Sequence, residues 1–156
     1  MSEVRFTSSL PAEHRDDIER LLFFNGNQAK VVGSVGFVTQ RYGVPRIRVV
    51  DERVRIGLDP HEPQTLFAVE LEDDEPHPIG VIIYVREDDA LVVLFVAVDE
   101  AFSSQGEHAG VGLLRLIMAE LQGVARRVRG IGTVAVYLGR TTPTRIAVKR
   151  DAPTSF

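Results

Sequence analysis

The sequence between Leu91 and Leu138 constrains the fold of this chain more than any other part. It begins with Leu91–Val98, an almost entirely apolar stretch that predicts a buried strand. Gly110 and Gly112 then precede an amphipathic helix, and a second apolar stretch predicts a strand over 133–138. Two buried strands joined by a helix form a crossover unit, in which the strands are parallel and the connection is right-handed. We therefore expect this unit to organise an α/β domain.

Composition narrows the classes of protein that the chain can belong to. Its 156 residues, 44% of them hydrophobic, predict one globular domain over 1–156. A net charge of −4 gives no reason to expect nucleic-acid binding. Cysteine is absent and the four histidines are far apart in sequence, so we expect neither disulfides nor a metal site. With no secretion signal and no apolar run of about 18 residues, we expect a cytoplasmic protein that does not enter membranes.

Hydrophobic periodicity and turn residues predict the other elements. Residues 28–45 fit a short helix or an irregular loop equally well. The predicted elements are a strand over 4–7, a helix over 11–24, a hairpin of 46–50 and 53–56, an antiparallel meander of 65–71, 79–86 and 91–98, a helix over 110–129 and a short strand over 144–148.

The predicted hairpin carries arginines in alternation. Arg46, Arg48, Arg53 and Arg55 should share one face, with Arg41 nearby. One interpretation is a solvated face whose charges keep an edge strand from aggregating. The other is a pocket for an anionic substrate or for the phosphates of a cofactor.

Two adjacent segments resemble the GNAT (N-acetyltransferase) superfamily. The segment VAVDEAF (Val96–Phe102) looks like the fourth strand of that family, and GVGLLRLI (Gly110–Ile117) looks like its acyl-CoA pyrophosphate loop and third helix. The resemblance covers about 65–139 and, more loosely, 1–24. It implies a GNAT-like mixed sheet of the α/β (α+β) class, with an antiparallel meander followed by the crossover and with helices on both faces.

The resemblance also implies a co-substrate, acetyl-CoA or another acyl-CoA. Its pantetheine arm would pair with the main chain of Val96 and Val98. Its pyrophosphate would lie on main-chain N–H groups at the start of the helix. The residues that this implies for the pyrophosphate are His108, Ala109, Gly110, Val111 and Gly112.

The chain departs from the family pattern at three places. The stretch from Ser103 to Ala109 makes the loop longer than the family's usual turn. Glu107 stands where the family has Arg or Gln, so either the loop carries Glu107 outward, or Gln105 takes the role, or the co-substrate is lost. Only 17 residues follow Gly139, which leaves no counterpart of the family's closing helix and its tyrosine. We expect a second subunit, in a homodimer, or the arginine-rich hairpin to cover the sheet there.

Acyl transfer to an amine needs a base for the ammonium and an acid for the thiolate. Glu70, Tyr84, Glu100 and Tyr137 lie on or beside the predicted central strands, yet each also fits a structural role, so the catalytic residues stay unassigned. The first hypothesis is an acyl-CoA-dependent N-acyltransferase acting on a small-molecule or protein amine. The alternative is a non-catalytic GNAT-fold module that acts through dimerisation, ligand sensing or protein interaction.

Overall fold

The protein, seen here in a computed structural model, is described at residues 3–23, 38–58, 62–102, 112–137 and 143–148. Its main sheet has six strands in the order β1-β4-β5-β6-β7-β8, and β2 and β3 form a separate two-stranded sheet. The strands are β1 (Glu3–Thr7), β2 (Arg46–Val50), β3 (Arg53–Gly57), β4 (Gln64–Glu72), β5 (Glu75–Glu87), β6 (Ala90–Val98), β7 (Thr133–Val136) and β8 (Thr144–Ala147). The helices are η1 (Ala12–His14), α1 (Arg15–Phe23), η3 (Glu100–Phe102) and α3 (Leu113–Arg127), and residues 38–42 are also helical.

The sheet is mixed, as the sequence predicts. The neighbouring pairs β1–β4, β4–β5, β5–β6 and β7–β8 are antiparallel, whereas β6 and β7 are parallel. The parallel pair confirms the crossover through α3. The final short strand, β8, pairs along the outer edge of β7. This arrangement confirms the predicted class, an α+β sheet with a meander followed by a crossover.

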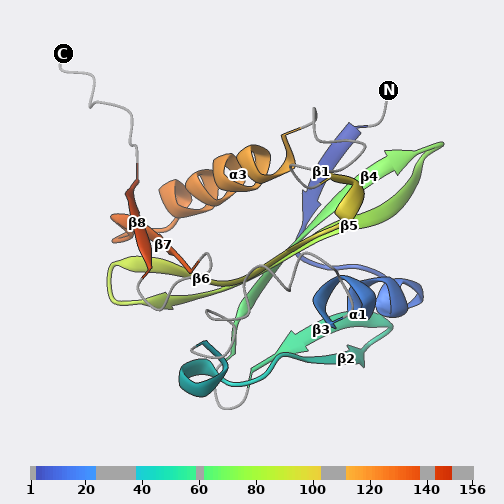
Figure 1. Ribbon diagram of the computed structural model, residues 1–156, viewed down its shortest axis with the longest axis horizontal. Coiled ribbons are helices and arrows are strands. Elements are labelled where there is room, and N and C mark those ends of the chain that lie inside the picture. The colour runs from blue at the N-terminus through green and yellow to red at the C-terminus, as the bar shows by residue number, and fades with distance from the viewer. Residues whose placement is uncertain (1–2, 24–37, 59–61, 103–111, 138–142, 149–156) are drawn as a thin grey trace.

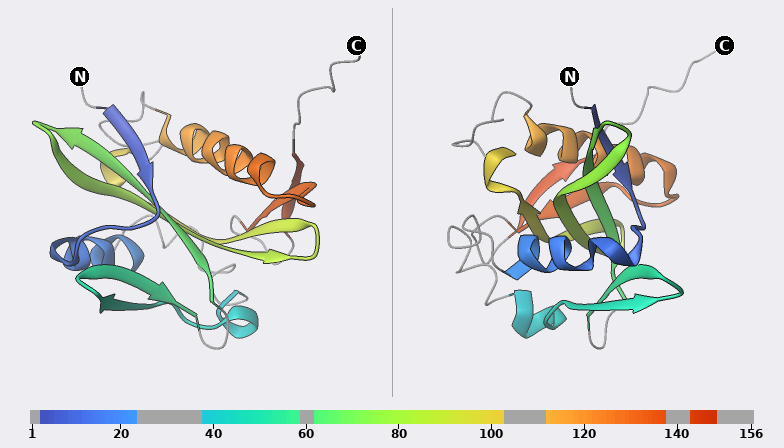
Figure 2. Two further views of the ribbon diagram at one scale, coloured as in Figure 1. Left: turned by 180° about the vertical axis from the view of Figure 1, so that it is seen from behind. Right: turned by 90° about the vertical axis from the view of Figure 1, so that its right-hand side faces the viewer.

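Helices cover both faces of the sheet. Figure 1 shows α3 on one side, with α1 and the β2–β3 hairpin on the other, and the rotated views in Figure 2 agree. One buried cluster joins Leu113, Ile117 and Leu121 of α3 to the sheet. A second cluster joins Ile18 and Leu22 of α1 to the opposite face. β6 is buried along most of its length because both of its faces are covered.

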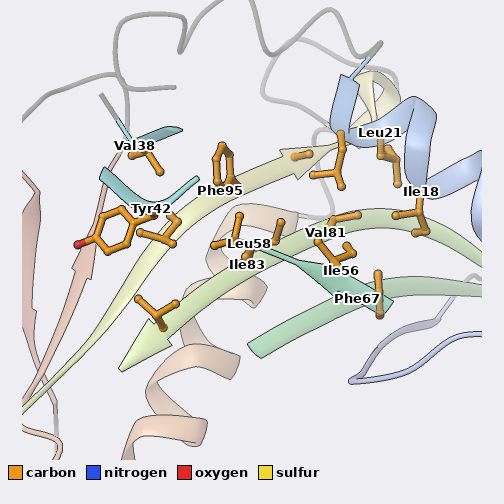
Figure 3. Close-up of a cluster of buried hydrophobic side chains, with 14 of the residues drawn as sticks. Ile18, Leu21, Val38, Tyr42, Ile56, Leu58, Phe67, Val81, Ile83 and Phe95 are labelled. Atoms are coloured by element: carbon orange, nitrogen blue, oxygen red, sulfur yellow. The ribbon is translucent and has the colours of Figure 1, made fainter. Parts of the chain in front are cut away.

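The hairpin folds back onto the α1 face. Ile56 of β3 lies in the same buried cluster as Phe67 and Val81 of the sheet, and Tyr42 of the 38–42 helix joins them (Figure 3). The cluster reaches Tyr137 just beyond β7. At the outer edge of β7 the described structure has β8 as the neighbour, so a cover by the arginine-rich hairpin stays a prediction. A homodimer stays a prediction. In the described part of the chain, no helix has the length and apolar character needed to cross a membrane.

Burial of Tyr42 makes the fold sensitive to alkaline pH. Its side chain is 1% exposed, and burial first, then the carboxylate of Glu87, raise the pKa of Tyr42 well above its usual value. Burial likewise raises the pKa of Tyr84, with Arg127 opposing the shift. A pKa that is higher in the folded state gives stability that is complete below the unfolded pKa of about 10 and falls as pH rises above it.

We therefore expect the free energy of unfolding to decrease from about pH 10 upward, by at most about 1.4 kcal/mol per pH unit for each such tyrosine. Urea denaturation at a series of alkaline pH values measures the slope. Tyr42→Phe should reduce the slope, whereas an unchanged slope in this variant would contradict a raised pKa at Tyr42.

Candidate functional site at the end of β6

The strands β6 and β7 separate part of the way along β6. Their parallel pairing runs from Ala90 opposite Thr133 to Val93 opposite Val136. One further contact follows, from the Tyr137 N–H to the Val93 carbonyl at 3.3 Å. β6 continues to Val98, so within the described ranges its distal half has a ladder neighbour on the β5 side alone.

A β-bulge lies where the two strands separate. In the β5–β6 pair, Ile83 is opposite Phe95 while Tyr84 is opposite Val93, so Leu94 is the extra residue. Leu94 and Phe95 consequently both belong to the cluster on the α1 face. A bulge bends its strand and increases the local twist, which is how β6 can turn away from β7 at this point.

The orientation of the β6 main chain beyond the bulge follows from the ladder. The Asp99 N–H donates to the Ile79 carbonyl of β5 at 2.8 Å. Main-chain groups in an antiparallel pair point alternately toward and away from the partner strand. Ala97 therefore bonds toward β5, while Val96 and Val98 direct their N–H and C=O groups to the side where β7 has ended. This is the edge at which the resemblance places these two residues.

The start of α3 lies next to this edge in the chain path. After β6, the Asp99 carboxylate accepts the Ala101 N–H at 2.9 Å and shapes the η3 turn. Phe102 of η3 packs in the same cluster as Leu113, the first residue of α3. The end of β6 and the first turn of α3 are thus held to one core. Figure 2 shows this end of the sheet beneath the beginning of α3.

The N-cap residue of α3 has no side chain with which to cap the helix. Gly112 takes φ 67° and ψ 48°, in the left-handed region. Among the described residues that are not its chain neighbours, no atom lies within 4 Å of the position that a Cβ would take at Gly112. The turn contains no acidic residue, although acidic residues are favoured there. Its unpaired N–H groups and positive dipole end suit an anion.

Arg115 lies in this first turn and is exposed. A cation at a helix N-terminus is unfavourable for the helix itself. No ion pair to Arg115 is present among the described residues. The place of Arg115 in the first turn is known only from the structure, because the sequence predicts a helix that begins at Gly110 whereas α3 begins at Leu113.

The predicted cofactor-binding residues are only partly within the described chain. Val96, Val98 and Gly112 are placed as above. The four residues His108, Ala109, Gly110 and Val111 lie outside the described residues, as does Glu107, so their predicted roles stay predictions.

The structure sorts the four catalytic candidates by position. Tyr137 lies where β6 and β7 separate, is 8% exposed and belongs to the α1-face cluster. Glu100 is exposed in η3, directly after β6. Tyr84 packs toward α3 near Arg127 at the helix C-terminus, at the other end of that helix from the site. Glu70 is paired with His77 beyond the end of β6. Of these four, only Tyr137 lies at the separation point, whereas Glu100 lies past the far end of β6.

Comparison with known proteins gives two structural likenesses. No family model matches the sequence, and no curated protein matches it. An IAA acetyltransferase from Bacillus cereus has 18% identity and a TM-score of 0.39 over 86% of this chain. The crystal structure of nourseothricin acetyltransferase has 19% identity and a TM-score of 0.44 over 85% of this chain and 72% of that one. The present chain spans 65% of the length of the first of these acetyltransferases.

Proposed function

We propose that this protein is an acyl-CoA-dependent N-acyltransferase that transfers an acetyl or similar acyl group to a small-molecule or protein amine. One observation carries the proposal. A strand edge with outward main-chain groups at Val96 leads to η3, which shares a core with the start of α3, and the N-cap of α3 is Gly112, which has no side chain to cap the helix. An acyl-CoA has the matching chemistry, with amide groups along its pantetheine arm and an anionic pyrophosphate beyond them.

The described residues fit such a ligand. Val96 offers an N–H donor and a carbonyl acceptor to an extended amide chain, as a strand does in β-augmentation. The first-turn N–H groups of α3, after the open space at Gly112, suit the pyrophosphate. Arg115 adds a cation that faces no described carboxylate within ion-pair distance. When bound, the thioester would supply an activated acyl carbon.

The separation of β6 from β7 gives this chain a position for the thioester end of an acyl-CoA. Tyr137 is the ionisable residue at the separation point, with its amide fixed to the Val93 carbonyl. Its hydroxyl is our candidate for the proton donor to the leaving thiolate. A general acid must lie within hydrogen-bond reach of the atom it protonates.

Binding and turnover test the proposal separately. Acetyl-CoA at 100 times its dissociation constant should stabilise the protein by about 2.7 kcal/mol, which raises the melting temperature by about 5–10 °C. Free CoA should act similarly, and ATP serves as a control anion. Release of free thiol across a panel of amines measures transfer. No shift with any CoA ester would refute the proposal, and a shift without turnover would favour the alternative, a ligand-sensing module.

A further inference from the structure

The β2–β3 hairpin presents four arginines on one face. Arg46 and Arg48 alternate along β2, Arg53 and Arg55 alternate along β3, and the register places Arg48 directly opposite Arg55. The apolar side chains of β3 lie on the other face, in the core. The sequence prediction of a shared arginine face is therefore confirmed, and the two interpretations of that face can be compared with its geometry.

Two of these arginines differ from the others in their surroundings. Directly opposed like charges destabilise an antiparallel pair, so the Arg48–Arg55 pairing opposes folding of the hairpin. No carboxylate of the described residues forms an ion pair with either guanidinium. Arg53, by contrast, donates from its Nε to the Ser9 hydroxyl at 2.7 Å. Arg48 and Arg55 are thus two adjacent cations with no described carboxylate within ion-pair distance.

A hollow of about 340 Å³ lies beside this pair. Arg48 and Arg55 line it together with Glu62 and Pro63, which precede β4. A second hollow of about 390 Å³ shares Arg55, Glu62 and Pro63 and extends to Ser9. Small-molecule sites begin at about 300 Å³, so each hollow can hold one small polar group but not a large ligand.

Gly57 allows Arg48 to reach this hollow. A Cβ at Gly57 would come within 3.0 Å of Arg48 Nη2. The guanidinium of Arg48, a β2 residue, therefore lies across the backbone of β3, where a side chain would displace it.

We propose that Arg48 and Arg55 bind the phosphate group of a small molecule in this hollow. Each guanidinium offers two parallel N–H donors, and one such fork already satisfies a carboxylate. Two forks match a phosphate, which has three terminal oxygens and up to two negative charges. The size of the hollow favours a small molecule over a polyanion. The proposal is independent of acyl-CoA binding at β6, because it concerns different residues on the hairpin.

Glu62 provides a control whose replacement should change phosphate affinity in the direction opposite to that of the arginine variants. Its carboxylate is exposed and lines both hollows. A carboxylate there repels an anion, so Glu62→Gln should tighten phosphate binding. Arg46 provides the matched control of the same sign. It lies on the same strand and the same face as Arg48, but it lines neither hollow.

The test is a titration with inorganic phosphate at constant ionic strength, followed by NMR through the Nε–H signals of Arg48 and Arg55 and the amide of Gly57. We expect saturable shifts at these three groups. Arg48→Gln or Arg55→Gln should weaken binding by about tenfold or more, in line with the loss of a charge-assisted hydrogen bond. Arg46→Gln should change the dissociation constant by less than about twofold, because Arg46 lines neither hollow and an exposed charge without a direct contact contributes little.

Thermal unfolding without phosphate provides a second readout. Arg55→Gln should raise the melting temperature at low salt, because it removes the repulsion from Arg48. Phosphate should stabilise the wild-type protein and not this variant. Acetate that binds as tightly as phosphate would overturn the assignment to phosphate. Chemical shifts that do not saturate would establish a diffuse basic face and overturn the site. The same holds if Arg46→Gln loses as much affinity as Arg48→Gln, either for phosphate or for a short oligonucleotide.

Discussion

Replacing Val96 by proline is expected to weaken acetyl-CoA binding while leaving the protein folded. The N–H of Val96 points away from β5, so its removal breaks no ladder bond to that strand. On an edge without a pairing strand, proline is tolerated, and we expect a loss of stability of about 1 kcal/mol. The ligand, however, loses a main-chain donor, which should cost about 1–3 kcal/mol or about 10–100-fold in affinity. Calorimetric titration with acetyl-CoA measures this loss.

Ala97→Pro is the matched control for the same strand. The main chain of Ala97 bonds toward β5, and its side chain is 3% exposed. Proline there removes a ladder bond in the middle of the sheet and should lower the free energy of unfolding by about 3 kcal/mol or more. Equal destabilisation of the two variants would contradict the alternation derived for β6. A folded Val96→Pro protein with wild-type affinity would contradict a ligand on this edge.

The central place of β6 in the sheet could be predicted because β6 is apolar at every position. Such a strand must be covered on both faces, which places it at the centre of the sheet with a helix on each side. The hairpin was predictable from the alternation of arginine with Val and Ile. The position of its turn, at Asp51 and Glu52, was predicted, but its conformation was not, because both residues take positive φ, of 53° and 62°, where glycine or asparagine is usual.

The geometry of the candidate site could not be read from the same apolar run. Leu94 is indistinguishable from its neighbours in sequence, and only its pairing with β5 reveals it as the bulged residue. Separation of β6 from β7 depends on where a four-residue strand, β7, stops, and strand ends are set by tertiary contacts. The outward direction of the Val96 main chain follows from both of these features.

The position of the helix start determines which charged residues lie in the first turn of α3. A helix starting at Gly110 would place Arg115 in its second turn, where a cation has little effect on the helix dipole. Because α3 starts at Leu113, Arg115 is instead in the first turn, opposed to the dipole. Arg126 and Arg127 lie in the last turn of α3, where cations favour the helix.

Arg115→Glu is expected to stabilise the protein and to weaken its binding of acetyl-CoA. The substitution places an acid in the first turn of α3, which should raise the free energy of unfolding by about 0.3–1 kcal/mol. A pyrophosphate at the same helix end would lose an attractive charge and gain a repulsive one. Two like charges 4 Å apart cost about 1 kcal/mol in water and about 4 kcal/mol at an effective dielectric constant of 20, so we expect at least about a tenfold loss of affinity.

Arg126→Glu changes the net charge by the same amount at the opposite end of the helix. It removes a favourable cation from the last turn and should lower the free energy of unfolding by about 0.3–1 kcal/mol. From Arg115 to Arg126 the helix rises about 16 Å, well beyond the screening length of about 8 Å at physiological salt. The affinity of the Arg126→Glu variant for acetyl-CoA should therefore stay near that of the wild type. Urea denaturation and calorimetric titration of both variants separate the two effects. A general charge effect would weaken acetyl-CoA binding equally in both variants. A ligand at the first turn of α3 requires a loss of affinity in Arg115→Glu alone. The helix dipole requires opposite shifts in the free energy of unfolding of the two variants.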